Sequence, residues 1–291
     1  MVIRLHYKIA AAVLLAALLL CAALAFGSRH TQAIAPVDER IRLPIIMYHE
    51  IRAYNNNRMA ISPYEFESDL RYLQRNGYTT ITMTDLIHYV YDDMPLPEKP
   101  IILTFDDGYL NNYAYAFPLL KKYHMTAVLS VIGKNADDFT RVPDKNLDYS
   151  HATWDQLAEM ARSGCFEIQN HTYNMHTITY KRYGCAKNAG ESEEHYEKAL
   201  TDDLMRCQQE ISDNLGTVPN TFTYPYGNVS SDSLAIIKKL GFLASLSCKY
   251  GINLIDRNPD GLYCLMRISR YHDVSLSKTL SDAMKTLKYA K

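Results

Sequence analysis

The sequence predicts an α/β fold, a distorted (β/α) barrel of about seven parallel strands, preceded by one N-terminal membrane-spanning or signal helix. Short apolar runs of strand type alternate with helical stretches from residue 43 to residue 268, and polar side chains follow several of these runs. This alternation favours a parallel sheet, and a closed barrel brings many strand ends to one site. An unbroken apolar run over residues 9–26 indicates the helix.

The apolar run 9–26 has basic residues before it and a polar stretch after it. In a helix it would span roughly 27 Å, close to the thickness of a bilayer core. The flanking charge places everything after the run outside the cytoplasm, whether the run is kept as an anchor or cleaved. We therefore expect residues 1–27 to be a signal anchor or signal peptide, 28–42 a linker, and 43–291 a domain that is secreted or held on the outer face of the cytoplasmic membrane.

The composition fits an exported globular domain. Hydrophobic residues make up 47% of the chain and charged residues 22%, and the formal net charge is -1. This charge gives no general attraction to nucleic acid, so we expect no nucleic-acid partner, and no obligate protein partner is evident. Cys21 lies in the apolar run, and the other cysteines are odd in number, so we expect one or two disulfides at most.

Each strand and helix of the domain has a local signal. Ser62 and Pro63 provide a cap and a first-turn proline for one helix, which Gly77 ends, and Thr84 can cap the next. The predicted strands cover residues 43–48, 78–83, 100–105, 126–132, 166–170, 221–224, 242–246 and 263–268. The predicted helices cover residues 64–76, 84–91, 110–123, 153–163, 191–215 and 231–240.

Two adjacent carboxylates end a strongly apolar strand. Asp106 and Asp107 follow residues 100–105 directly, and Gly108 permits a sharp turn after them. A buried, unpaired carboxylate is costly, so this strand end calls for a cation or a proton nearby. The alternative is a capping Asp-Asp-Gly turn, and on a straight strand the two side chains would point in opposite directions.

Two histidines follow another strand. His171 and His176 come directly after residues 166–170, and a loop there can bring both imidazoles together. Two histidines and one carboxylate form the set of three protein ligands that leaves an open position on a catalytic zinc ion. A histidine pair taken alone is more often structural, but each strand-end cluster strengthens the case for the other.

The two clusters together resemble a known family. Thr-Phe-Asp-Asp-Gly-Tyr at 104–109, followed by His-Thr-x-x-x-His at 171–176, is similar to the NodB-homology polysaccharide deacetylases, carbohydrate esterase family four. Tyr-Pro-Tyr-Gly at 224–227 resembles the family's Pro-Tyr-Gly segment, and the resemblance covers residues 44–268. It implies a metal-dependent hydrolase that removes N-acetyl groups from an N-acetylhexosamine polysaccharide of the cell envelope or from an exopolysaccharide.

The resemblance assigns roles to individual residues. Asp107, His171 and His176 match the family's metal ligands, and Asp106 matches the general base that takes a proton from the attacking water. The backbone N–H of Tyr226 matches the group that, with the metal, stabilises the tetrahedral oxyanion. The implied cofactor is one divalent ion, expected to be Zn²⁺, with Co²⁺, Ni²⁺ or Mn²⁺ as alternatives that the same ligands accept.

Amide hydrolysis also needs an acid for the departing amine, and two histidines are candidates. His49 ends the strand 43–48, and its Met-Tyr-His segment resembles the poly-N-acetylglucosamine deacetylase branch of the family. The spacing of His171 and His176 points to the same branch. His272 is the alternative, because much of the family carries this histidine late in the chain.

One position departs from the family pattern. Thr223 stands where many members carry an arginine that holds the base, so Arg267 or Arg270 is expected to supply that contact from a later strand. The candidates for contact with the sugar are Pro225, Tyr226, Tyr173, Trp154 and Arg267.

Two other functions stay open on the sequence alone. The same metal site would serve an esterase that removes O-acetyl groups from a polysaccharide such as xylan. A glycan-binding module could keep the fold and lack turnover, although every ligand and base position is filled. The expected partners are the N-acetylated polysaccharide substrate and, through the N-terminal helix, the membrane.

Overall fold

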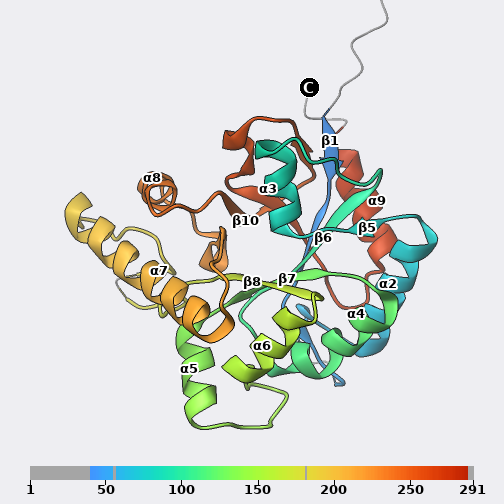
Figure 1. The fold of residues 1–291 in the computed structure, drawn as a ribbon, viewed down its shortest axis with the longest axis horizontal. Helices are drawn as coiled ribbons and strands as arrows, with labels where there is room; N and C mark the ends of the chain where they lie inside the picture. The colour runs from blue at the N-terminus through green and yellow to red at the C-terminus, as the bar shows by residue number, and fades with distance from the viewer. Residues whose placement is uncertain (1–39, 55–56, 181, 288–291) are drawn as a thin grey trace, which may run out of the picture. The chain divides into compact units, whose positions relative to one another are not determined.

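The computed structural model describes residues 40–54, 57–180 and 182–287. The apolar run 9–26, with Cys21, lies outside these residues, and so does most of the expected linker. No helix among the described residues is long and apolar enough to cross a bilayer. Figure 1 shows the domain that these residues form.

A closed ring of parallel strands forms the centre of the domain. Within the described residues the ring runs β2, β12, β10, β9, β8, β7, β6, and pairing between β6 and β2 closes it. Every neighbouring pair in the ring is parallel. The strands are β2 (Ile45–Tyr48), β6 (Pro100–Phe105), β7 (Ala127–Val131), β8 (Phe166–Asn170), β9 (Thr221–Thr223), β10 (Ala244–Tyr250) and β12 (Leu265–Ser269). The predicted parallel barrel is confirmed.

The seam between β8 and β9 has little backbone pairing of its own. Asn170 and Phe222 are its one registered backbone pair among the described residues. A side chain extends the seam, because the amide oxygen of Gln169 accepts hydrogen bonds from the backbone N–H groups of Asn220 (3.0 Å) and Thr221 (2.9 Å). These bonds satisfy backbone donors that a longer strand pairing would otherwise use.

Short strands add to this ring. β1 (Ile41–Leu43) pairs antiparallel with β11 (Asn253–Ile255), and β3 (Glu50–Ile51) pairs parallel with β4 (Ala60–Ile61). β5 (Thr79–Thr80) lies beside the first two residues of β6. The sequence did not predict β3, β4 or β11, and it assigned Ile41 and Arg42 of β1 to the linker, since so few residues carry little alternating pattern.

Helices surround the ring, and Figure 1 shows α2, α4 and α9 grouped on one side of it. The α-helices are α2 (Pro63–Arg75), α3 (Met83–Tyr91), α4 (Phe117–Tyr123), α5 (Gly133–Arg141), α6 (Trp154–Arg162), α7 (Glu193–Leu215), α8 (Ser231–Lys239) and α9 (Leu276–Thr286). A π-helical turn, η1 (Asn112–Ala116), precedes α4, and short 3₁₀ turns are η2 (Pro225–Gly227) and η3 (Pro259–Leu262). The sequence pattern does not reveal α5 or α9.

Local chemistry explains where the first two of these helices begin. Ser62 caps α2 through a reciprocal pair of hydrogen bonds with Glu65, as the sequence predicts. The cap predicted for the next helix is wrong by two residues, because Thr82 caps α3. The backbone N–H of Thr84 instead donates to the Glu167 carboxylate of β8 at 3.1 Å, which ties this helix to the ring.

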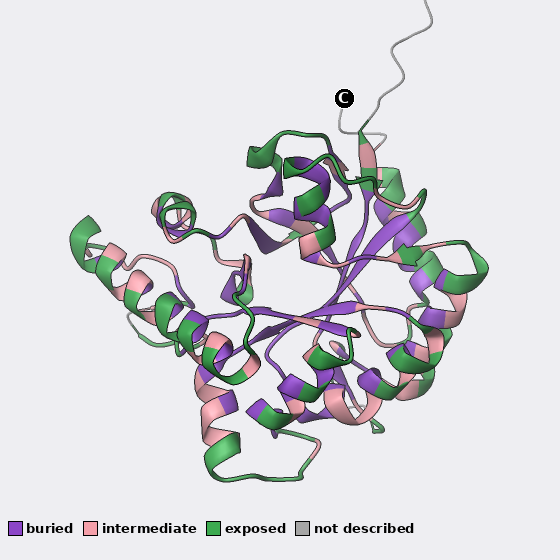
Figure 2. Cartoon of the chain, viewed as in Figure 1, coloured by how far each residue is buried: buried purple, intermediate pink, exposed green. Residues whose placement is uncertain are grey.

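The strands are buried and the outward faces of the helices are exposed, as Figure 2 shows. Four aromatic rings interlock on the helix side of the strands. Tyr48 lies 5.0 Å from Phe105 and 5.3 Å from Phe66, and Phe105 lies 5.6 Å from Phe166 between ring centroids. Because such packing leaves little freedom, β2, β6 and β8 are held in fixed relation, and so are the residues at their ends.

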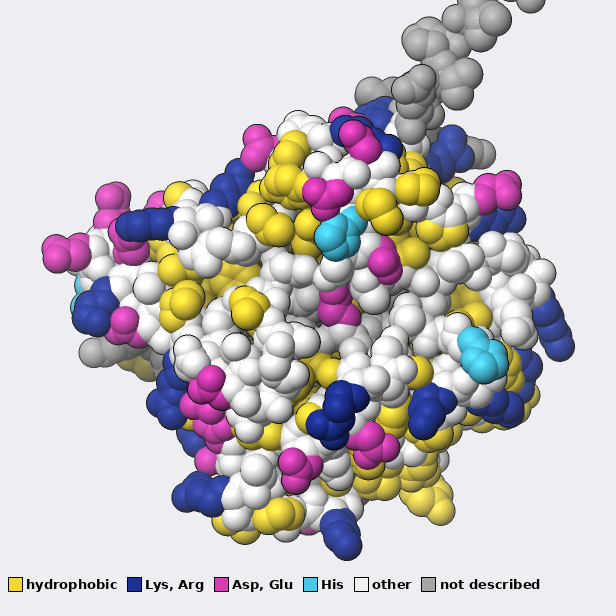
Figure 3. Space-filling view, viewed as in Figure 1, with side chains coloured by type: hydrophobic (Ala, Val, Ile, Leu, Met, Phe, Trp, Pro, Cys, Tyr) yellow, Lys and Arg dark blue, Asp and Glu magenta, His cyan; other side chains and the backbone are white. Residues whose placement is uncertain are grey.

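The five described cysteines are all free thiols, so the structure has no disulfide among them. On the face of the molecule shown in Figure 3, positive and negative side chains are interspersed. This mixture agrees with the near-neutral net charge of the chain.

Candidate active site and metal centre

The carboxyl ends of the strands surround one cavity of about 410 Å³. The residues that line it are His49, Asp106, Asp107, Tyr109, His171, His176, Tyr226 and Cys248. They come from the segments that follow β2, β6, β8 and β9, and from β10 itself. The predicted convergence of separate strand ends is therefore present, and it follows from the closure of a parallel ring.

The adjacent carboxylates both reach this cavity because the chain turns immediately after β6. Asp107 has a φ of 72° and Gly108 a φ of 81°, so the extended geometry that would separate the two side chains has already ended. A Cβ atom on Gly108 would lie 3.2 Å from Val131 Cγ1. Glycine is therefore favoured there, because it adopts a positive φ without strain and leaves the Val131 side chain in place.

Asp107, His171 and His176 form a compact group of potential metal ligands. Asp107 Oδ1 lies 3.2 Å from His176 Nε2 and 3.5 Å from His171 Nε2, and one ligand atom from each residue lies within 4.8 Å of the others. Asp107 Oδ1 is buried and accepts no hydrogen bond of acceptable geometry. Three donor atoms that face one another, one of them an unsatisfied oxygen, fit a divalent ion with an open coordination position.

Hydrogen bonding fixes the orientation of His171. Its Nδ1 lies 2.7 Å from the backbone carbonyl oxygen of Thr223. A carbonyl only accepts, so Nδ1 carries the proton and, in the neutral ring, Nε2 presents a lone pair toward Asp107. Burial lowers the pKa of His171, but Asp107 and Asp106 outweigh it and raise that pKa. The raised pKa reflects the negative potential that a bound cation would neutralise.

Asp107 remains ionised in this environment. Burial raises the pKa of Asp107, but its interactions with His171 and His176 are stronger and hold that pKa well below the usual range. The pKa of His176 is lowered by burial and by the nearby His171. A side chain must lose its proton to bind a metal ion. The Asp107 carboxylate is ionised, and the lowered pKa of His176 favours its neutral imidazole, so both meet this requirement.

Asp106 is held by a buried arginine from β12. Arg267 Nη1 donates to Asp106 Oδ1 at 2.7 Å and Nη2 donates to Oδ2 at 2.8 Å, while Nε donates to the backbone oxygen of Ser247. Of the two arginines considered from the sequence, Arg267 makes this contact. Burial raises the pKa of Asp106, but Arg267 and His171 outweigh it and lower that pKa. The hydroxyl of Thr223 instead lies 2.7 Å from that of Ser130.

His49 lines the same cavity as the candidate metal ligands. Its Nε2 is 4.0 Å from Asp106 Oδ2, and its side chain is 25% exposed. Asn112 Nδ2, in the π-helical turn η1, donates to the backbone oxygen of His49 at 3.0 Å and so holds the residue in place. π-Helical turns are frequent at functional sites. The sequence gave no indication of this contact.

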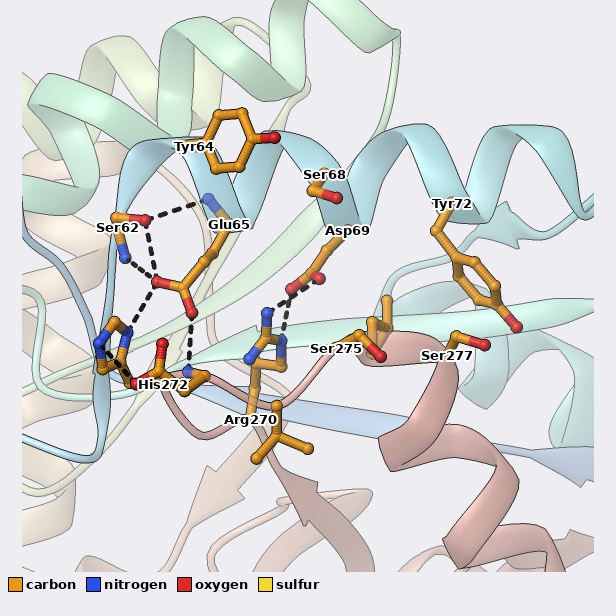
Figure 4. Close-up of a pocket in the computed structure, with 13 residues that line it drawn as sticks. Ser62, Tyr64, Glu65, Ser68, Asp69, Tyr72, Arg270, His272, Ser275 and Ser277 are labelled. Atoms are coloured by element: carbon orange, nitrogen blue, oxygen red, sulfur yellow. Dashed lines mark hydrogen bonds and ion pairs between the residues drawn. The ribbon is translucent and has the colours of Figure 1, made fainter.

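His272, the alternative acid of the sequence analysis, does not line the cavity. It lines a separate pocket beneath α2, shown in Figure 4. Its Nδ1 is 2.9 Å from Glu65 Oε2, and its Nε2 is 3.3 Å from Asp273 Oδ2. These three residues could also be considered a metal site, but the Glu65 carboxylate already accepts from the backbone N–H groups of Ser62 and Asp273.

Tyr226 lines the cavity in a left-handed conformation with φ of 57°. Its ring centroid is 4.4 Å from that of His176 and 5.0 Å from that of Tyr183. Pro225, predicted to contact the sugar, is buried and does not line the cavity. A loop residue that the sequence did not single out, Tyr183, thus adjoins the site through Tyr226.

Three other residues predicted to contact the sugar are unsuited to that role. Tyr173 and Trp154 are 8% and 4% exposed, and both donate hydrogen bonds to the Asp137 carboxylate away from the cavity. Arg267 is 1% exposed and its guanidinium is committed to Asp106. None of the three lines the cavity, since aromatic and basic residues can serve the core as readily as a ligand.

Comparison with known proteins identifies the family. A family model described as polysaccharide deacetylase matches residues 93–245, which is more than half of the chain. This chain belongs to the polysaccharide deacetylase family. The deacetylase is 31% identical over 238 residues to the protein YxkH of Bacillus subtilis, covering 82% of this chain and 75% of that protein.

Other relatives of this deacetylase carry a specific name. A poly-beta-1,6-N-acetyl-D-glucosamine N-deacetylase from Staphylococcus aureus is 26% identical over 224 residues, 72% of this chain and 71% of the relative. The protein of that name from Escherichia coli is 27% identical over 223 residues. The match covers 68% of this chain but 32% of the Escherichia coli protein.

Solved structures have the same fold as this deacetylase. A de-N-acetylase from Aggregatibacter actinomycetemcomitans superimposes with a TM-score of 0.71 at 26% identity, covering 83% of this chain and 99% of that one. IcaB from Ammonifex degensii superimposes with a TM-score of 0.66 at 27% identity, covering 84% and 96%.

Proposed function

We propose that this chain removes N-acetyl groups from a poly-N-acetylglucosamine exopolysaccharide or a related N-acetylhexosamine polymer. The observation that carries the proposal is the convergence of Asp106, Asp107, His171 and His176 in one cavity. The names of the Staphylococcus aureus and Escherichia coli relatives support the choice of substrate. The geometry of the cavity supports a hydrolytic site, and the names of the relatives support the choice of polymer as the substrate.

Asp107, His171 and His176 are the residues that would hold the metal ion. A divalent ion there would act as a Lewis acid toward the amide carbonyl and make the neighbouring water a better nucleophile. We favour Zn²⁺, since two histidines and one carboxylate are a common zinc set. Co²⁺, Ni²⁺ and Mn²⁺ remain alternatives because the same ligand types accept them.

Asp106 is the proposed general base. Its carboxylate is ionised, and the bidentate contact with Arg267 holds it at a fixed angle beside the ligand group. There it can accept a proton from the attacking water. We assign the oxyanion contact to the backbone N–H of Tyr226, since this residue lines the cavity next to His176.

His49 is the proposed general acid. It lines the same cavity as the base, and its Nε2 faces Asp106 Oδ2 at 4.0 Å. A histidine in that position can protonate the departing amine nitrogen, so the bond to the acetyl carbon breaks without the release of an amide anion. We further infer export of the chain, with the apolar run 9–26 as its anchor or signal.

The direct test is acetate release from acetylated glycans by the full-length protein. We expect release from β-1,6-linked N-acetylglucosamine oligosaccharides, and loss of release after treatment with a chelator, with recovery on addition of Zn²⁺. The His49→Ala variant should lose the alkaline limb of the pH profile of kcat, because that limb reports deprotonation of the acid. Release from O-acetylated xylan with none from the oligosaccharides would instead indicate an esterase. Glycan binding without any acetate release would indicate a silent module.

A further inference from the structure

A second tyrosine extends the active-site surface beyond the cavity. The segment after His176 folds back on itself as a hairpin, with an antiparallel bridge between Ile178 and Tyr183. Gly184 N–H donates to the carbonyl oxygen of Thr177 at 2.9 Å and closes the hairpin. The hairpin begins next to a proposed metal ligand, and its returning segment carries Tyr183 to Tyr226, which lines the cavity.

The hairpin is fitted to the turn that carries Tyr226. Gly184 has a φ of 59°, and a Cβ atom there would lie 3.2 Å from Pro225 O and 3.2 Å from Tyr226 Cδ2. Asn228 Nδ2 also donates to the backbone oxygen of Tyr183 at 3.2 Å. Close approach of two backbones, with glycine at the contact, positions the Tyr183 ring against the Tyr226 ring at 5.0 Å and 36°.

The loop beyond the hairpin is anchored in the core. Cys185 is fully buried, and its carbonyl oxygen accepts a hydrogen bond from the Tyr196 hydroxyl of α7 at 2.8 Å. The Arg182 guanidinium lies 2.6 Å from the Glu191 carboxylate. Side chains placed on a held loop are preorganised, and a ligand that contacts them has little ordering to impose.

The two rings are nevertheless open to solvent. Tyr183 is 47% exposed and Tyr226 is 37% exposed, although each touches another aromatic ring. The His176 ring contacts the Tyr226 ring, and the Tyr226 ring contacts the Tyr183 ring. This series of rings leads outward from the cavity. Contiguous exposed rings beside a polar cavity are typical of ligand-binding sites.

We propose that Tyr183 and Tyr226, here called the tyrosine pair, bind the sugar residue next to the one that is deacetylated. This inference rests on the proposed function. A pyranose ring has an apolar C–H face that packs on an aromatic ring, and its hydroxyls can bond with phenolic hydroxyls. Since Tyr226 stands between Tyr183 and His176, a sugar over Tyr183 would be a neighbour in the polymer and not the reacting residue. The tyrosine pair therefore selects oligomers over short substrates.

The test compares a pentasaccharide and a disaccharide of β-1,6-linked N-acetylglucosamine, with acetate release from the full-length, metal-loaded protein. In the Tyr183→Ala variant the ratio of kcat/KM for the pentasaccharide to that for the disaccharide should fall about ten-fold, mainly through a higher KM for the pentasaccharide. Tyr183→Phe should retain most of the ratio, since it keeps the ring. Tyr64 is an exposed tyrosine on α2 that does not line the cavity, so Tyr64→Ala is the matched control and should keep the wild-type ratio.

A wild-type ratio in Tyr183→Ala, or an equal fall in Tyr64→Ala, would overturn the proposal. If the wild-type protein releases no acetate from either glycan, the proposed function is rejected, and the tyrosine pair is then tested separately. Calorimetric titration with the pentasaccharide then decides the inference: weaker binding by Tyr183→Ala supports the tyrosine pair, and equal binding rejects it.

Discussion

Two arginines near the end of β12 each hold a buried aspartate, and their surroundings differ. Arg267 pairs with Asp106 beside the cavity, and Arg270 pairs with Asp69 of α2, in the pocket of Figure 4. Burial raises the pKa of Asp69 to about 6, even though Arg270 opposes this. The pKa of Asp106 is lowered, because Arg267 and His171 outweigh burial.

The polar atoms around the two pairs differ in the same way. Under α2 the Tyr48 hydroxyl donates to Asp69, and the neighbouring Glu65 carboxylate accepts backbone hydrogen bonds. In the cavity, Asp107 Oδ1 and His49 Nδ1 are buried and have no hydrogen-bond partner. Polar groups that satisfy one another are typical of a structural network, whereas the unpaired atoms of Asp107 and His49 at the cavity can still meet a ligand.

The largest expected difference concerns the metal. Replacement of His176 by alanine removes one of three ligands, so the divalent metal content should fall from about one ion per chain to near zero, and acetate release should fall with it. The matched change His272→Ala, in the other donor cluster, should leave the metal content as in the wild type. Elemental analysis of the purified proteins checks both. If His272→Ala lost the metal and His176→Ala retained it, the metal site would be the cluster of Glu65, His272 and Asp273 and not the cavity.

The next difference concerns the two aspartates. Asp106→Asn removes the proposed base and should reduce kcat by about 10²–10⁴-fold while the metal stays bound. Asp69→Asn should keep turnover but lower the free energy of unfolding by roughly 1–3 kcal/mol, since Arg270 loses its buried charge partner. Steady-state kinetics and denaturant unfolding of both variants provide the measurement. Near-normal turnover in Asp106→Asn would refute the role assigned to it.

The smallest expected difference is a shift of the pH profile. Asp106 acts as a base only when ionised, and Arg267 lowers its pKa. Arg267→Lys keeps one positive charge but loses the bidentate contact, so the pKa of Asp106 should rise and the acid limb of kcat/KM should move to higher pH. Arg270→Lys should leave this limb in place. If the acid limb of kcat/KM in Arg267→Lys is unchanged or moves to lower pH, Arg267 does not lower the pKa of Asp106.

The fold and the convergence of the proposed metal ligands could be predicted from the sequence because apolar strands end there in ionisable residues. Residues 100–105 and 166–170 each run directly into such a cluster, and ring closure brings parallel strand ends together. The partner of Asp106 could not be chosen in the same way. Arg267 and Arg270 both lie near the end of one strand, and only its register against its neighbours decides which one meets Asp106.

Predictions for loop residues were less successful. His272 matched a late family position, but the turn after β12 takes it to Glu65. Trp154 and Tyr173 looked suited to a sugar and instead share Asp137. Tyr183 carries no sequence signal of its own, since its place depends on the contact between two loops distant along the chain.

The sparse seam between β8 and β9 makes the donor set dependent on closure of the ring. His171 ends one side of the seam, and the Thr223 carbonyl that fixes its tautomer ends the other. If the seam opened, His171 would lose its hydrogen bond to the Thr223 carbonyl. Its imidazole could then rotate, and the ligand atoms of Asp107, His171 and His176 would no longer face one another. It follows that an ordered donor set requires a closed seam, and that a change that opens the seam would weaken the binding of a divalent ion.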